Sequence, residues 1–141
     1  IDSPRGSIQL GIWYHFAAIV DAPAGVMRIF INGAEVSNTT AFGADRIWRS
    51  TTPLRIGWTH EEEGEHYSSF AGQIDEVRIW NVVRTAEEIE ATMDMTLSGD
   101  EPGLMGYWNF DDGATDDRTQ NGNNGTLIAN AQVVEAPLFD D

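Results

Sequence analysis

The dipeptide Asn32-Gly33, which lies between two short strand-like runs, constrains the fold more than any other feature of the sequence. The run 26–31 (VMRIFI) precedes the dipeptide and the run 34–37 follows it. Asparagine and glycine both tolerate positive φ, which the tight turn of a two-residue β-hairpin requires. Residues 26–37 are therefore predicted to form an antiparallel hairpin.

Other segments carry the residues and the period-two alternation that are typical of strands. Residues 12–20 (IWYHFAAIV) have one wholly apolar face, which predicts a strand that is well buried in a sheet. One helix is predicted from Thr85 to about Met93, because Thr85 and Glu88 form a capping box. Further strands are predicted at residues 53–58, 70–80, 104–110 and 126–128.

Many short strands, frequent turn residues and a single helix together predict the fold class. They are typical of an all-β, antiparallel sandwich or jelly roll. Strands do not alternate regularly with helices, which excludes a parallel α/β sheet. The chain of 141 residues is expected to form a single domain over 1–141, with a weakly patterned tail at 129–141.

The charge of the chain is strongly one-sided. It has 23 acidic residues against 8 basic ones, all of them arginine, and a net charge of −15. Such a charge repels phosphate backbones and therefore argues against nucleic acid as a partner. The acidity fits either a solvated, soluble surface or oxygen ligands for a divalent cation such as calcium. The sequence contains no cysteine and no apolar run of membrane-spanning length.

Several motifs, taken in order, carry a resemblance to a known family. They are residues 13–17 (WYHFA), 28–33 (RIFING), 53–57 (PLRIG), 70–81 (FAGQIDEVRIWN), 103–110 (GLMGYWNF) and 121–127 (NGNNGTL). Over about residues 11–128 the chain resembles the laminin G-like family of concanavalin A-like domains. The resemblance implies an antiparallel jelly-roll β-sandwich with one short helix, and a binding role on the cell surface or outside the cell.

The chain departs from this family at its start. The family has several opening strands before the WYH segment, whereas only about ten residues precede it here. Either the domain is truncated at its N-terminus or another chain supplies these strands. Because an open sheet exposes unpaired backbone, a strand-exchanged or homo-oligomeric assembly is a further hypothesis.

Asp75 is the first candidate for a metal ligand. In strict alternation it shares a strand face with Val77 and Ile79, where a carboxylate is costly unless it has a partner. An arginine, backbone amides at a bulge, or a metal could supply that partner, and hydrogen bonding is the favoured interpretation. The resemblance implies the metal alternative, because related sandwich folds place calcium near the aspartate of this strand.

The loop from residue 111 to residue 124 is the second candidate. Asp111, Asp117, Asn121 and Asn123 supply oxygens on a glycine-punctuated chain, as calcium requires. The alternative is a solvated turn, since asparagine and aspartate fold their own backbone locally.

The third candidate is the charged loop 59–69, which follows Trp58. Trp58 and Tyr67 could stack on a sugar ring while His60, His66 and the neighbouring acids bond its hydroxyls. A zinc site from the two histidines and a glutamate is the alternative, although the spacing matches no strong pattern.

Two tryptophans, Trp48 and Trp58, are candidates for the aromatic surface of a ligand site. Trp48 lies in a polar segment between Arg46 and Arg49 and is predicted to be exposed and ligand-binding. Trp58 is expected in the ligand site or, if its alternation with Leu54 and Ile56 holds, in the core.

An enzyme is not expected. The sequence lacks the alternating carboxylates of sandwich glycosidases, and Asp75 and Glu76 should point to opposite faces of a strand. The sequence therefore predicts a non-catalytic, calcium-stabilised carbohydrate-binding or adhesion module, extracellular or on the cell surface, whose partner is a glycan or an extracellular protein. The alternatives are a structural or protein-interaction spacer and, less favoured, a fragment of a glycoside hydrolase.

Overall fold

The structure is a computed structural model that describes residues 6–36, 40–41, 51–60 and 67–134. At residues 40–41, 59–60 and 67–68 it describes the backbone alone. The chain forms two compact units, one made of residues 1–48 and 80–104, the other of residues 49–79 and 105–141. Each unit is described by itself below.

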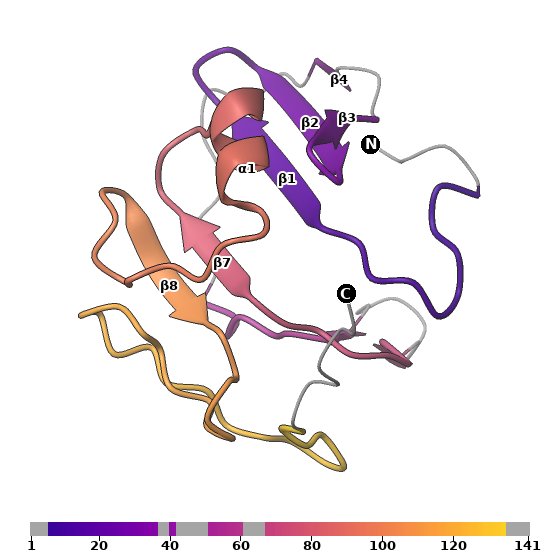
Figure 1. The fold of residues 1–141 in the computed structure, drawn as a ribbon, viewed down its shortest axis with the longest axis vertical. Helices are drawn as coiled ribbons and strands as arrows, with labels where there is room; N and C mark the ends of the chain where they lie inside the picture. Colours follow the sequence, from indigo (N-terminus) through magenta and orange to yellow (C-terminus); the bar gives the residue numbers. More distant parts are fainter. Residues whose placement is uncertain (1–5, 37–39, 42–50, 61–66, 135–141) are drawn as a thin grey trace. The chain divides into compact units, whose positions relative to one another are not determined.

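The first unit contains a small antiparallel sheet and one helix (Figure 1). Strand β1 (Phe16–Asp21) pairs with β2 (Val26–Ile31) in the register Phe16↔Ile31 to Asp21↔Val26. On its other side β2 pairs with β3 (Ala34–Glu35) and with β4 (Thr40–Ala41). The sheet is therefore organised around β2.

The hairpin predicted at Asn32-Gly33 is confirmed. Both residues have positive φ, 48° and 77°, as its turn requires. Asn32 also ties the turn back to the chain before β1, because its Oδ1 accepts from the His15 backbone N–H at 2.9 Å and its own N–H donates to the His15 carbonyl at 2.9 Å. The turn thus fixes both the register of the hairpin and the point at which β1 begins.

The strand predicted at residues 12–20 is shorter than expected. It begins at Phe16, which lies opposite Ile31, the last residue of β2 before the turn. The chain reverses there, so β2 has no residue left to extend the ladder toward residue 12. The prediction was therefore wrong for residues 12–15 and right for the remainder.

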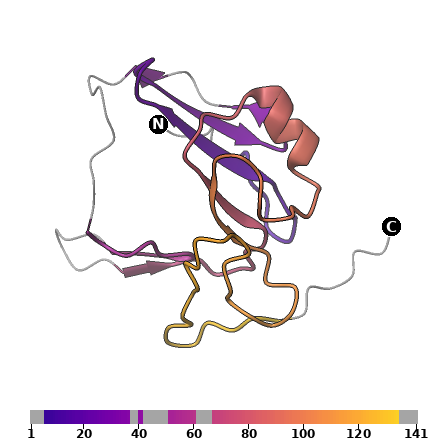
Figure 2. The ribbon, with the colours of Figure 1, turned by 90° about the vertical axis from the view of Figure 1, so that its left-hand side faces the viewer.

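Helix α1 (Ala86–Thr92) covers one face of this sheet, and Figure 2 shows it beside the strands. Its buried Ile89 packs with Ile19 of β1 and Phe30 of β2. The predicted capping box is present: Thr85 Oγ1 accepts from the Glu88 backbone N–H at 3.2 Å, and Thr85 N–H donates to Glu88 Oε2 at 2.9 Å. The cap starts the helix where its apolar side meets the sheet.

The other face of β1 is apolar and exposed. Phe16 is 58% exposed and Val20 is 39% exposed, and Ala18 between them is exposed as well. These side chains alternate with Ala17 and Ile19, which belong to the helix-covered face. Only one face of β1 therefore has the burial that its sequence predicts.

The second unit contains a short hairpin. Strand β5 (Trp58–His60) pairs with β6 (Tyr67–Ser69) in the register Trp58↔Ser69 to His60↔Tyr67. The predicted strand at residues 53–58 was wrong, because Gly57 has a φ of 76° and the ladder starts only after it. Trp58 is the first residue of a strand and not the last.

Two further strands form a pair. One lies directly before helix α1 and the other directly before the C-terminal loop. Strand β7 (Val77–Trp80) pairs with β8 (Leu104–Trp108). The long strand predicted at residues 70–80 was wrong before Val77, because Glu76 has a φ of 53° and breaks the alternation. The short strand predicted at residues 126–128 is not a strand in the structure.

Candidate functional site

The Asx-rich loop after β8 is closed by one buried carboxylate, that of Asp117. Its Oδ1 accepts from the backbone N–H groups of Tyr107 at 3.1 Å and Thr119 at 2.9 Å. Its Oδ2 accepts from the backbone N–H and the side-chain Nδ2 of Asn123, at 2.9 and 3.0 Å. Burial raises the pKa of Asp117, but these hydrogen bonds outweigh it and hold the pKa below its usual value.

The two asparagines predicted as calcium ligands anchor the same loop to β8. Both Asn121 and Asn123 donate from Nδ2 to the Met105 carbonyl, at 3.1 and 3.0 Å. In addition, Trp108 donates from its indole Nε1 to the Asn123 carbonyl at 3.0 Å. Calcium at Asp117 would compete with the hydrogen bonds that its carboxylate accepts, whereas the Oδ1 atoms of the two asparagines take no part in these bonds.

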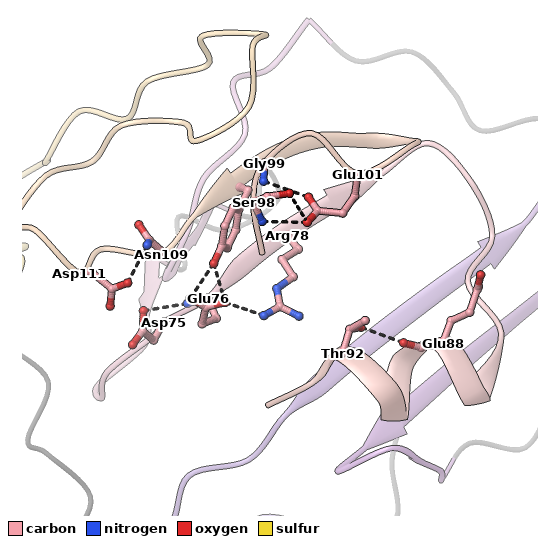
Figure 3. A network of polar contacts seen from close by, with 11 residues as sticks. Asp75, Glu76, Arg78, Glu88, Thr92, Ser98, Gly99, Glu101, Asn109 and Asp111 are labelled. Carbon is pink, nitrogen blue, oxygen red and sulfur yellow. Dashed lines mark hydrogen bonds and ion pairs between the residues drawn. The ribbon is translucent and has the colours of Figure 1, made fainter. Parts of the chain in front are cut away.

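Asp75 and Asp111 lie on different segments of the second unit, and Figure 3 shows both beside Asn109. Asp75 Oδ1 accepts from the Glu76 backbone N–H at 2.8 Å, and Asp111 Oδ2 accepts from Asn109 Nδ2 at 2.6 Å. Burial raises the pKa of Asp75, and the charges of Glu76 and Asp111 raise it further, against the Glu76 hydrogen bond that lowers it. Two repelling carboxylates are a better fit for a cation than the Asp117 loop is.

This carboxylate pair is small. The described residues contain no cluster of three histidine, cysteine, aspartate or glutamate side chains that could hold a metal ion. Calcium at Asp75 and Asp111 would need backbone carbonyls or water for its remaining ligands. Calcium at the five predicted residues therefore stays a prediction.

Glu76 does not point simply to the opposite face, as strand alternation predicts. Its positive φ turns it so that the buried Tyr107 hydroxyl donates to Oε1 at 2.8 Å and to Oε2 at 2.9 Å. Arg78 adds an ion pair to Glu76 Oε2 at 2.5 Å, and its guanidinium carbon lies 5.7 Å from the Tyr107 ring centroid. This triad was not predicted from the sequence, although the spacing of Glu76 and Arg78, two residues apart, indicates such an ion pair.

Trp58 has the exposure that a ligand site requires. Its side chain is 37% exposed, and Leu54 and Ile56, which were expected to lie with it in the core, are exposed too. The guanidinium carbon of Arg55 lies 4.1 Å from the indole centroid, which is a cation–π contact. Trp58 therefore does not lie in the core, as one interpretation of the sequence had it. Its contact with Arg55, three residues earlier, was not predicted.

The predicted ligand site has four other residues, and the structure describes the backbone of two of them. His60 and Tyr67 lie opposite each other in the β5–β6 register, so their backbones adjoin. Trp48 and His66 lie outside the described residues, as do the glutamates between β5 and β6. The structure thus brings His60 and Tyr67 to the same end of the hairpin that begins with Trp58.

These elements define a class of protein: antiparallel β, with a single short helix in the described part and a surface aromatic on a hairpin. Residues 3–90 match the laminin G family that is described as the concanavalin A-like lectin/glucanases superfamily, and the chain belongs to that family. The predicted resemblance and the predicted all-β, concanavalin A-like fold class are confirmed.

Individual relatives agree with this assignment. A crystal structure of a Bacteroides ovatus protein, which carries a provisional carbohydrate-binding assignment, matches with a TM-score of 0.65 and 29% identity. The match covers 86% of this chain and 38% of that protein. The Sushi, von Willebrand factor type A, EGF and pentraxin domain-containing protein 1 of Rattus norvegicus is 24% identical over 88 residues, and that of Mus musculus is 24% identical over 87.

These relatives are much longer than the matched region. The match to each of the two rodent proteins covers 60% of this chain but 2% of the relative. The activities and partners of the whole relatives therefore do not transfer directly to this chain.

Within the described residues, none of the helical structure is long and apolar enough to cross a membrane.

Proposed function

We propose that the chain is a non-catalytic carbohydrate-binding module of an extracellular or cell-surface protein, and that Trp58 is the centre of its glycan site. The observation that carries the proposal is the exposed indole of Trp58 at the start of β5, held by Arg55. Trp48, His60, His66 and Tyr67 are the further predicted contacts.

The chemistry of a sugar ring suits such a residue. The C–H face of a hexose is apolar and packs on an aromatic side chain, while its hydroxyls need polar groups at the rim. The stack of Arg55 on the indole limits the motion of both side chains, so less conformational entropy is lost when a ligand binds.

Two further observations support this function. The family description names lectins alongside glucanases, and the Bacteroides ovatus relative carries a provisional carbohydrate-binding assignment. Glycoside hydrolysis needs two carboxylates that flank the scissile bond, and the sequence lacks their alternating pattern.

The test is affinity electrophoresis of the chain through gels that contain a panel of soluble polysaccharides. We expect at least one of them to retard the protein, and Trp58→Ala to lose most of the retardation. Trp13→Ala is the matched control, because Trp13 is similarly exposed, at 39%, and lies in the other unit. Equal retardation of the two variants would contradict the assignment of Trp58.

A second candidate function, that of a protein-interaction domain, is favoured by the exposed apolar face of β1. Phe16, Ala18 and Val20 form this face, and among the described strands β1 pairs with β2 alone. Strand exchange or a homo-oligomer would bury both the face and the open edge. Light scattering tests this, since a monomer over a wide concentration range would contradict self-association.

A further inference from the structure

Arg55 differs from three of the other four described arginines in what it contacts. Arg78, Arg84 and Arg118 each form an ion pair with a carboxylate. Arg55 is exposed, stacks on Trp58, and makes no ion pair with any carboxylate in the described part of the chain. In a protein with 23 acidic residues, its guanidinium N–H groups remain available for a ligand beside the exposed indole.

We infer that Arg55 contacts the ligand directly and that the ligand is a neutral glycan, not a uronate or a sulfated one. This inference rests on the proposed function and adds a residue and a ligand class to it. Arg55 donates hydrogen bonds to the hydroxyls of the sugar whose C–H face packs on the exposed part of Trp58.

The geometry supports the role of Arg55. The guanidinium carbon of Arg55 lies over the Trp58 ring, 4.1 Å from its centroid. The guanidinium carries five N–H donors in a fixed planar fork, so those that do not face the ring can donate to a bound ligand. Hydroxyl oxygens at the rim of a bound sugar accept such bonds, which are stronger than bonds from a neutral donor. The stack therefore offers an apolar surface and a polar rim from two residues three positions apart.

The charge of the chain determines the class of glycan. A net charge of −15 repels a polyanion, and one arginine does not reverse that field. Acidic side chains repel uronates and sulfates, so the charge of the chain suits an uncharged, hydroxyl-rich ligand.

The experiment compares neutral with anionic polysaccharides at two salt concentrations. The neutral probes are laminarin, xylan, galactan and galactomannan; the anionic probes are polygalacturonate, alginate and heparin. Affinities are measured at about 20 mM and at about 500 mM NaCl, which changes the screening length several-fold. We expect binding to a neutral probe with little change between the two concentrations.

The variants are Arg55→Gln and Arg84→Gln. Arg84 is the matched control, because it also stacks on a tryptophan, with 4.3 Å between its guanidinium carbon and the Trp80 centroid, but pairs with Glu88. Loss of a charged hydrogen-bond donor to the sugar should weaken binding about tenfold or more in Arg55→Gln. Arg84→Gln should bind as the parent chain does, and circular dichroism checks that both variants fold.

The outcomes separate the two proposals. If neither kind of glycan binds the parent chain, the proposed function fails, and this inference with it. If a glycan binds and Trp58→Ala abolishes binding, but Arg55→Gln binds normally, the proposed function stands and the role of Arg55 is wrong. Preferential, salt-sensitive binding of an anionic probe would overturn the neutral class.

Discussion

The two carboxylate oxygens of Asp117 accept hydrogen bonds from three backbone amides and one side-chain amide. These donors come from β8 and from both arms of the loop that follows it. One ionised carboxylate therefore links β8 to the loop that follows it. The sequence supplied the aspartates and asparagines, but it could not say whether their oxygens faced a metal or their own backbone.

Asp117→Asn should destabilise the chain by about 1–3 kcal/mol at neutral pH, because one oxygen becomes a donor that faces two donors of Asn123. The native pKa of Asp117 lies below its usual 3.8, so its stabilisation is complete above that value. It is lost as the pH falls through the lowered native pKa. Thermal unfolding at several pH values should therefore show a gap between parent and variant that closes only in strong acid.

Asp75→Asn should have the opposite effect at neutral pH. The native pKa of Asp75 lies above its usual 3.8, so the native state loses stability as the pH rises from that value through the raised pKa. The variant keeps an oxygen for the Glu76 amide and removes the repulsion, which should raise stability by less than about 1 kcal/mol.

The Asp75→Asn measurement is made with a chelator present, so that calcium does not compete. Asp112→Asn is the control, because the hydrogen bond from Arg118 lowers the pKa of Asp112 and predicts a change of opposite sign. A variant at residue 75 that is less stable than the parent above pH 5 or so would contradict the repulsion.

At the scale of single elements, the capping box of α1 is the clearest case of a local signal that the fold obeys. Thr85→Ala removes the acceptor for the Glu88 amide and should cost about 1 kcal/mol. This loss corresponds to a fall of about 3–5 °C in the unfolding midpoint. Thr85→Ser keeps the acceptor and should stay close to the parent; an equal loss in both would mean that the cap contributes nothing.

Elements defined by a local chemical rule were predictable, whereas their ends were not. The Asn32-Gly33 hairpin and the Thr85 cap follow from two to four residues each. The strands around Gly57 and Glu76 were extended too far, because a positive φ at these residues breaks an alternation that the sequence continues. A glycine hints at such a break, but a glutamate does not, since its conformation depends on Tyr107 and Arg78.

At the scale of the whole molecule, the order of the motifs along the chain predicted the family, because its members share the same strands and turns in the same order. The site was less predictable. Exposure of Trp58 depends on whether neighbouring strands cover it, and alternation with Leu54 and Ile56 suggested that they do. The single-domain prediction stays a prediction beside the two compact units.

The net charge gives a test of calcium that involves the entire chain. We expect the unfolding midpoint to rise when calcium replaces a chelator. The corresponding gain in the free energy of unfolding is up to a few kcal/mol at a large excess of calcium over Kd. Magnesium at equal concentration is the control, because any divalent cation screens a charge of −15. Equal shifts for both cations, or a shift that survives in a variant lacking both Asp75 and Asp111, would leave screening as the explanation.

The asparagine turns have a consequence for chemical ageing. Asn-Gly pairs deamidate readily, since the glycine nitrogen can attack the preceding carboxamide, and asparagine is among the thermolabile residues. The chain has three such pairs, at residues 32–33, 121–122 and 124–125, and in the folded state each asparagine side chain is held by a hydrogen bond to another segment. The lifetime of the covalent structure is thus coupled to the fraction of time the chain spends unfolded, and any deamidation that occurs there permanently alters the residues that shape its turns.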